Sequence, residues 1–325
     1  DPDAQIFYWT RYDSEEELVA NDWNVCRQVM AEGASVLLNQ DNTLPLAADT
    51  KFSCFSQSSV DPVKVGTGSA FVSTGEGASL YSALEDSFQP GCVNTDLWKF
   101  YVTSGYKREN AALSGGDPSQ YRINEVPWEK YTDALKSTFA DYGDAALVTL
   151  SRSSGEGADL PSGLEALEPY MTGGDYLQLC KEEMELLQNL KDLKDQGVFK
   201  KIIVLLNSSS TLQLDFIDEY DIDAVVWTGN LGINGLPAVT DILAGKVNPS
   251  GRIVDTFLKD NHSSPAMVNY DAFPYTNASQ LDLAFAQNNT APGIEKCNMN
   301  YVVYQEGIYV GYRYYETRYE DYVLG

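Results

Sequence analysis

Histidine and basic residues are scarce in this 325-residue chain, and their scarcity excludes several kinds of site. The single histidine, His262, lies in an Asn-His-Ser-Ser-Pro segment, and the sequence contains no nucleophile elbow. A Ser-His-Asp hydrolase would need both features, so the sequence argues against that mechanism. With 22 basic against 47 acidic side chains, the formal charge of -25 repels nucleic-acid phosphates and anionic lipids. We therefore expect neither nucleic acid nor a membrane surface as a partner.

Cysteine is also sparse. The chain has five cysteines without a Cys-x-x-Cys pair, so neither a zinc site nor a thioredoxin-type motif is predicted; they are Cys26, Cys54, Cys92, Cys180 and Cys297. We expect free thiols, with Cys26 and Cys54 as buried structural thiols. The acidic clusters at 182–185 and 218–223 lack calcium-loop spacing and are interpreted as solvated faces. No metal and no organic cofactor is implied.

Long apolar runs are missing as well. No run approaches the roughly 18 residues of a membrane span, and no segment resembles a signal peptide. The chain begins at Asp1 instead of a methionine, which we interpret as a processed or truncated piece. Secreted, cell-surface and cytoplasmic locations all stay open.

What the chain does contain is enough apolar material for a core, at 43% hydrophobic residues. A helix is predicted over 14–33 and another through Met184 to Leu193. Continuous apolar runs predict buried strands, of which the last three are parallel; they lie at 35–39, 145–150, 202–206 and 223–227. A further helix is predicted through Tyr131, Leu135 and Phe139. The fold class is α/β, a doubly wound and mostly parallel sheet sandwiched by helices, with a long irregular C-terminal segment.

Three regions are expected along the chain. Residues 1–23 form a lead-in and helix start, 24–257 form the α/β sandwich domain, and 258–325 form an irregular extension ending in a tyrosine-rich motif, packed on the same domain. Residues 66–70 are rich in glycine, but Phe71 stands where a dinucleotide loop needs its third glycine. We expect this loop to approach a ligand or a neighbouring domain closely.

The first candidate for catalysis is Glu156. It lies between Gly155 and Gly157, just beyond the strand at 145–150. The carboxyl ends of parallel strands are where open α/β sheets place their ligand sites, and flanking glycines leave the side chain free to reach a ligand. The alternative interpretation is a solvated glutamate in a flexible turn.

Four stretches of the chain resemble one known family. In chain order they are 31–39 with Leu-Pro-Leu at 44–46, Ser-Gly-Glu-Gly-Ala-Asp at 154–159, Asp-Ile-Leu-Ala-Gly-Lys-Val-Asn-Pro-Ser-Gly-Arg at 241–252, and Tyr-Gln-Glu-Gly-Ile-Tyr-Val-Gly-Tyr-Arg-Tyr-Tyr-Glu at 304–316. They make the chain similar to the α/β sandwich domain of glycoside hydrolase family 3, the family of β-glucosidases and related exo-β-glycosidases.

The resemblance implies site residues. It makes Glu156 the general acid/base of a retaining mechanism, and it makes Ser154 and Asp159 candidates for substrate binding. The chain departs from the family at Leu160, where relatives often have arginine, and at 229–235, where they often show Gly-Gln-Glu. We expect Glu156 on an exposed, mobile loop, with an ordinary pKa until a second domain covers it.

The resemblance also implies a second domain. The family's nucleophilic aspartate comes from a TIM barrel, which this sequence lacks. Asp22 stands in an Asn-Asp-Trp segment similar to the nucleophile motif, but it lies inside the predicted opening helix. We therefore expect the α/β domain of a retaining exo-β-glycosidase, completed by a TIM barrel of the same parent protein in either domain order. Its substrate would be a β-linked oligosaccharide or glycoside, and the piece alone would be inactive. The alternative is a non-catalytic carbohydrate-binding or scaffold module of the same ancestry.

Overall fold

A five-stranded sheet forms the centre of the computed structural model, which describes residues 10–66, 68–71, 77–109, 118–156, 160, 175–269, 273–277, 280, 300–318 and 323–324. The sheet order is β1 (Ser35–Asn39), β5 (Ala224–Trp227), β4 (Ile202–Ser208), β3 (Ala145–Arg152) and β2 (Phe52–Phe55). Strands β2 to β5 are parallel to one another. Strand β1 is an edge strand and pairs with β5 in the antiparallel direction. The mostly parallel sheet predicted from the apolar runs is confirmed.

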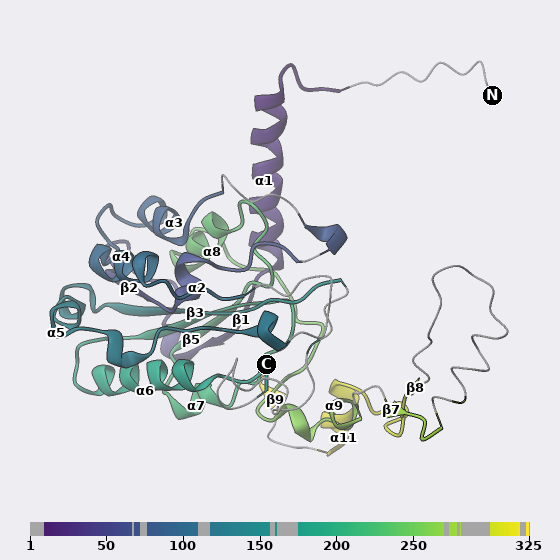
Figure 1. Ribbon diagram of the computed structural model, residues 1–325. Coiled ribbons are helices and arrows are strands. Elements are labelled where there is room, and N and C mark those ends of the chain that lie inside the picture. The colour runs from purple at the N-terminus through teal and green to yellow at the C-terminus, as the bar shows by residue number, and fades with distance from the viewer. Residues whose placement is uncertain are drawn as a thin grey trace, which may run out of the picture.

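Helices cover both faces of this sheet, as Figure 1 shows. On one face lie α1 (Glu15–Gly33), α3 (Leu80–Ser87) and α8 (Leu236–Leu243), and on the other lie α6 (Lys181–Asp195) and α7 (Phe216–Glu219); α2 (Gln57–Val60) and α4 (Thr95–Thr103) pack near β2. Alternate residues of β3 supply the two cores: Val148 and Leu150 join the α6 side, whereas Leu147 joins the α8 side. Strands that are covered on both faces need such continuous apolar sequences.

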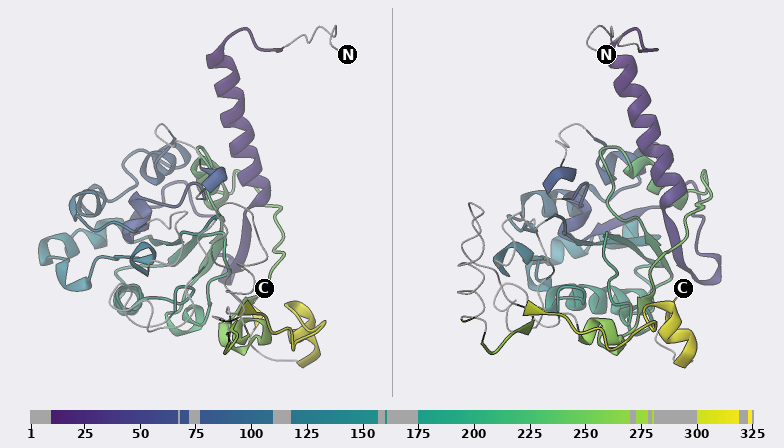
Figure 2. Two further views of the ribbon diagram at one scale, coloured as in Figure 1. Left: turned by 45° about the vertical axis from the view of Figure 1, so that its right-hand side comes forward. Right: turned by 90° about the vertical axis from the view of Figure 1, so that its right-hand side faces the viewer.

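Helix α1 extends well away from the sheet (Figures 1 and 2). The Ser14 hydroxyl accepts a hydrogen bond from the Glu17 amide and caps the helix, whose first turn is acidic as the helix dipole favours. At the other end Met30 is buried, and Arg27 forms an ion pair with Asp241. The predicted opening helix is confirmed. None of the helices in the described ranges is long and apolar enough to cross a membrane.

The predicted helix through Tyr131, Leu135 and Phe139 is wrong. The structure has three short turns instead: η4 (Trp128–Lys130), α5 (Asp133–Lys136) and η5 (Phe139–Tyr142). The hydroxyls of Ser137 and Thr138 donate to the carbonyls of Ala134 and Leu135, which ends α5 after one turn. The apolar spacing is still used, because the three residues that suggested a helix are all buried.

The described parts of the C-terminal segment contain two short strand pairs. Strand β6 (Phe257–Leu258) pairs with β9 (Val323–Leu324), and β7 (Phe273–Pro274) pairs with β8 (Asn300–Tyr301). The described residues of this segment also form the short helices η7 (Asn261–Ser263), α9 (Pro265–Val268) and α11 (Tyr312–Arg318). The Leu214 amide donates to the Leu258 carbonyl at 2.8 Å, which ties this segment to the sheet domain.

The described cysteines carry free thiols. Cys54, Cys92 and Cys180 are buried, and burial raises the pKa of Cys92 to about 12, which suits inert structural thiols. Cys26 was expected to be buried but is only partly covered, because it lies in the projecting part of α1.

Candidate active site

Glu156 lies at the carboxyl edge of the sheet, four residues beyond the end of β3. Its side chain is exposed, as predicted, but it is not without a partner. The Ser69 amide donates to Glu156 Oε2 at 2.8 Å, and the Ser69 hydroxyl donates to the same oxygen at 2.6 Å. Ser69 belongs to η2 (Gly68–Ala70), the glycine-rich loop expected to approach a ligand or domain closely. Two loops separated by 87 residues therefore meet at this carboxylate.

The Ser69 contacts favour the ionised form of the Glu156 carboxyl group. The hydroxyl and then the amide of Ser69 hold the pKa of Glu156 below its ordinary value, because both donate to the ionised carboxylate. In this domain Glu156 is consequently a carboxylate at neutral pH. Whether its loop is mobile stays a prediction.

A serine-to-alanine change tests the Ser69 contact. In the isolated chain, Ser69→Ala should move the pKa of Glu156 upward towards its ordinary value, because the stronger of the two donors is lost. The pKa is measured by NMR titration of the side-chain carboxyl carbon. Ser154→Ala is the matched control, since Ser154 bonds to Ser209 and should leave the pKa unchanged. Equal titration curves for wild type and Ser69→Ala would show that this contact does not form in solution.

The loop that carries Glu156 is held at its base by a buried arginine. Arg152, at the end of β3, is 1% exposed and donates to both carboxylate oxygens of Glu183, at 2.8 and 2.7 Å. It also donates to the carbonyls of Tyr176 and Gln178, both at 2.6 Å. Although burial opposes its charge, Glu183 raises the pKa of Arg152 above its ordinary value. Arg152 thus joins the strand that leads into the loop to the segment that leads out of it.

Tyr176 reinforces this connection. Its hydroxyl donates to the Ser153 carbonyl at 2.9 Å and accepts from the Ser153 amide at 2.7 Å. The prediction that the acidic cluster at 182–185 is a solvated face is wrong for Glu183, which is 1% exposed. Besides pairing with Arg152, Glu183 caps α6 by accepting from the Cys180 amide at 2.9 Å. The sequence offered one signal for a buried acidic residue, namely the charged Arg152 at the end of a mostly apolar strand. A buried arginine requires an acidic partner.

Asn207 organises the same edge of the sheet, and the sequence analysis missed it. Asn207 is buried at the end of β4 and accepts from the Val63 amide at 2.6 Å and from the Ser151 hydroxyl at 2.7 Å. Its amide group donates to the carbonyls of Val63 and Gly229, at 2.9 and 2.7 Å. Asn207 thereby fixes the segment that leads to Ser69 and the start of the 229–235 loop.

Of the two residues expected to bind substrate, the structure describes Ser154 but not Asp159. Ser154 is partly buried, and its hydroxyl lies 2.8 Å from the Ser209 hydroxyl beyond β4, so it connects two neighbouring strand ends. Asp159 lies outside the described residues. Their roles in substrate binding stay predictions.

A second unusual carboxylate, Glu125, is structural. It accepts from the Ser56 hydroxyl at 2.6 Å and from the amides of Gln57 and Val126 at 3.0 and 2.9 Å. Burial raises the pKa of Glu125 to about 7. With 2% of its surface exposed it is enclosed by protein, so a substrate does not reach it.

Within the described ranges, no three His, Cys, Asp or Glu side chains converge as they would around a metal ion. In the described part of this edge, the exposed carboxylate that meets a second loop is Glu156, with Ser69 as its partner. Proton transfer to and from a ligand that approaches this edge is what such a carboxylate can perform.

The fold and this edge define an α/β sandwich domain of the kind found in glycoside hydrolases. The chain belongs to the glycosyl hydrolase family 3 C-terminal domain family, whose model matches residues 35–312. It is 27% identical over 311 residues to a beta-glucosidase of Ruminococcus albus, covering 94% of this chain and 28% of that protein. It is 28% identical over 304 residues to beta-glucosidase A of Butyrivibrio fibrisolvens, covering 89% and 32%.

Solved structures agree with this assignment. Beta-glucosidase 3B of Thermotoga neapolitana, in complex with alpha-D-glucose, superposes with a TM-score of 0.68 at 25% identity. The similarity covers 95% of this chain but 38% of that one. The chain thus spans about a third of the length of these three relatives.

Proposed function

We propose that this chain is the α/β domain of a retaining exo-β-glycosidase and that Glu156 is its general acid/base. The observation that carries the proposal is the position of Glu156: exposed at the carboxyl edge of the sheet, and oriented by Ser69 from a second loop. Membership of the family, with beta-glucosidases among the relatives, supports the same activity. The substrate class would be a β-linked oligosaccharide or glycoside.

In such a mechanism two carboxyl groups about 5 Å apart act in turn. Glu156, as the acid, protonates the glycosidic oxygen while a nucleophilic aspartate attacks the anomeric carbon and forms a covalent glycosyl-enzyme intermediate. The leaving group departs, and Glu156, now a carboxylate, removes a proton from the water that releases the sugar. The nucleophile would come from a TIM barrel of the same parent protein, since Asp22 lies exposed within α1.

A site shared between two domains would change the charge state of Glu156. In the isolated domain Ser69 favours the carboxylate, which is the form required for the second step but not for the first. A nearby nucleophilic carboxylate and the exclusion of water would both favour the protonated acid. The barrel would therefore supply the nucleophile. It would also raise the pKa of Glu156, so that the side chain is protonated when the glycosidic bond breaks.

The isolated chain provides the test of this proposal. The purified 325-residue protein should not hydrolyse aryl β-glycosides above background, because without the nucleophile there is no route to the covalent intermediate. Release of the aryl alcohol is followed by absorbance, with Glu156→Gln as the reference. Turnover that is the same in wild type and Glu156→Gln would contradict the proposal, since the chain would then have an independent site.

A further inference from the structure

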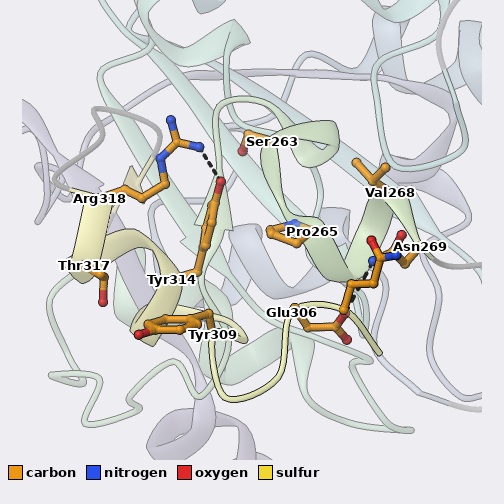
Figure 3. Close-up of a pocket in the computed structure, with 10 residues that line it drawn as sticks. Ser263, Pro265, Val268, Asn269, Glu306, Tyr309, Tyr314, Thr317 and Arg318 are labelled. Carbon is orange, nitrogen blue, oxygen red and sulfur yellow. Dashed lines mark hydrogen bonds between the residues drawn. The ribbon is translucent and has the colours of Figure 1, made fainter. Parts of the chain in front are cut away.

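A cavity of about 570 Å³ lies in the C-terminal segment, between α9 and α11 (Figure 3). Its volume lies within the range of sites that hold small molecules. None of its lining residues belongs to the Glu156 edge, and η2 and α11 are separate in all three views of the ribbon (Figures 1 and 2). The cavity is therefore distinct from the site described above.

The walls of this cavity are largely apolar and partly aromatic. Tyr309 and Tyr314 line one side, and Pro265 and Val268 line the other (Figure 3). The Arg318 guanidinium lies over the Tyr314 ring, 5.4 Å from its centroid, and donates to the Tyr314 hydroxyl, which fixes the orientation of this ring. Aromatic side chains such as these stack against the flat C–H face of a pyranose ring.

Polar groups surround the apolar walls. The Glu306 carboxylate accepts from the side-chain amide of Asn269 at 3.4 Å on one side, and the Arg318 guanidinium lies on the other. Among the described lining residues, Glu306 and Arg318 carry one charge of each sign. Such a mixture of hydrogen-bond donors and acceptors matches the hydroxyl groups of a neutral sugar. An anionic ligand would meet Glu306 and the overall charge of -25.

We propose that this cavity is an auxiliary binding site for a neutral β-linked glycan. The glycan would stack on Tyr309 and hydrogen-bond to Glu306 and Asn269. The auxiliary site would hold a substrate or product chain on the domain, at a place separate from the catalytic edge. The inference takes its ligand class partly from the proposed function, but the cavity, its aromatic wall and its described polar residues are independent of Glu156.

The test is binding of cellotetraose to the 325-residue chain, measured by isothermal titration calorimetry. Millimolar affinity is expected for one small open site. Tyr309→Ala should weaken binding at least fivefold and Glu306→Gln at least twofold. Tyr304→Ala is the matched control, because Tyr304 is 77% exposed in the same segment and does not line the cavity. Tyr309 is 46% exposed, so the melting temperature of Tyr309→Ala should stay unchanged.

Several results would overturn this inference. They are no saturable binding in the millimolar range, equal binding of an oligogalacturonide of the same length, or equal affinity of wild type and Tyr309→Ala. If Ser69→Ala or Glu156→Gln abolishes binding and Tyr309→Ala does not, the glycan binds at the catalytic edge, and the proposed function stands without the auxiliary site. A change of molar mass on Tyr309→Ala, measured by light scattering, would assign the surface to contact between copies of the chain.

Discussion

Replacing Arg152 with methionine is expected to lower the free energy of unfolding by about 3–5 kcal/mol. The main cause is that the Glu183 carboxylate, which is 1% exposed, would stay buried without a cation beside it. The carbonyls of Tyr176 and Gln178 would lose their donor as well. The change in free energy is measured by urea denaturation, with the midpoint and slope determined for each variant.

Two further variants separate this explanation from simple loss of packing. Arg152→Met combined with Glu183→Leu should recover most of the stability, because no unpaired charge then remains in the interior. Lys181→Met removes the cation of a pair whose side chains are 63% and 43% exposed, and it should cost less than about 1 kcal/mol. If Arg152→Met costs no more than Lys181→Met, the pair is not buried in solution as the structure describes it.

In the full-length enzyme that we propose, Glu156→Ala should lower kcat/KM by about 10²- to 10⁴-fold for substrates with poor leaving groups. Activated aryl glycosides should lose far less in the glycosylation step, because their leaving groups depart without a proton. The comparison of an alkyl glycoside with a dinitrophenyl glycoside of the same sugar measures this difference. Asp22→Ala, which removes an exposed carboxylate on α1, should leave both rates unchanged. Equal losses for both leaving groups would contradict a role of Glu156 as acid.

The sheet and its main helices could be predicted from the sequence for a physical reason. Strands covered on both faces need uninterrupted apolar runs, and β3, β4 and β5 are such runs. The helix through Met184 to Leu193 shows the spacing of one buried face, and it is found as α6. The helix predicted around α5 was wrong because apolar spacing does not reveal hydroxyl groups that bond to the backbone and end a helix. Ser137 and Thr138 carry such hydroxyl groups.

The candidate site could be predicted only in part. Glu156 was recognisable because its position beyond a buried strand and between glycines is local information. Ser69 lies 87 residues away, and Glu183 lies 31 residues from Arg152, so these partners depend on how the chain folds in space. Asn207 likewise connects loops that are distant in sequence. Local patterns indicate a candidate residue, whereas the contacts that surround it depend on the tertiary structure.

Azide rescue tests the central claim most directly, namely that Glu156 is the acid/base of a retaining site. In the parent enzyme carrying Glu156→Ala, added azide can enter the space left by the carboxylate and attack the glycosyl-enzyme intermediate without a base. The account predicts that azide restores the rate with a dinitrophenyl glycoside and that NMR identifies the product as the β-glycosyl azide. No rate increase and no glycosyl azide would contradict the assignment, as would an α-glycosyl azide, which would exclude a retaining β-glycosidase mechanism at this site.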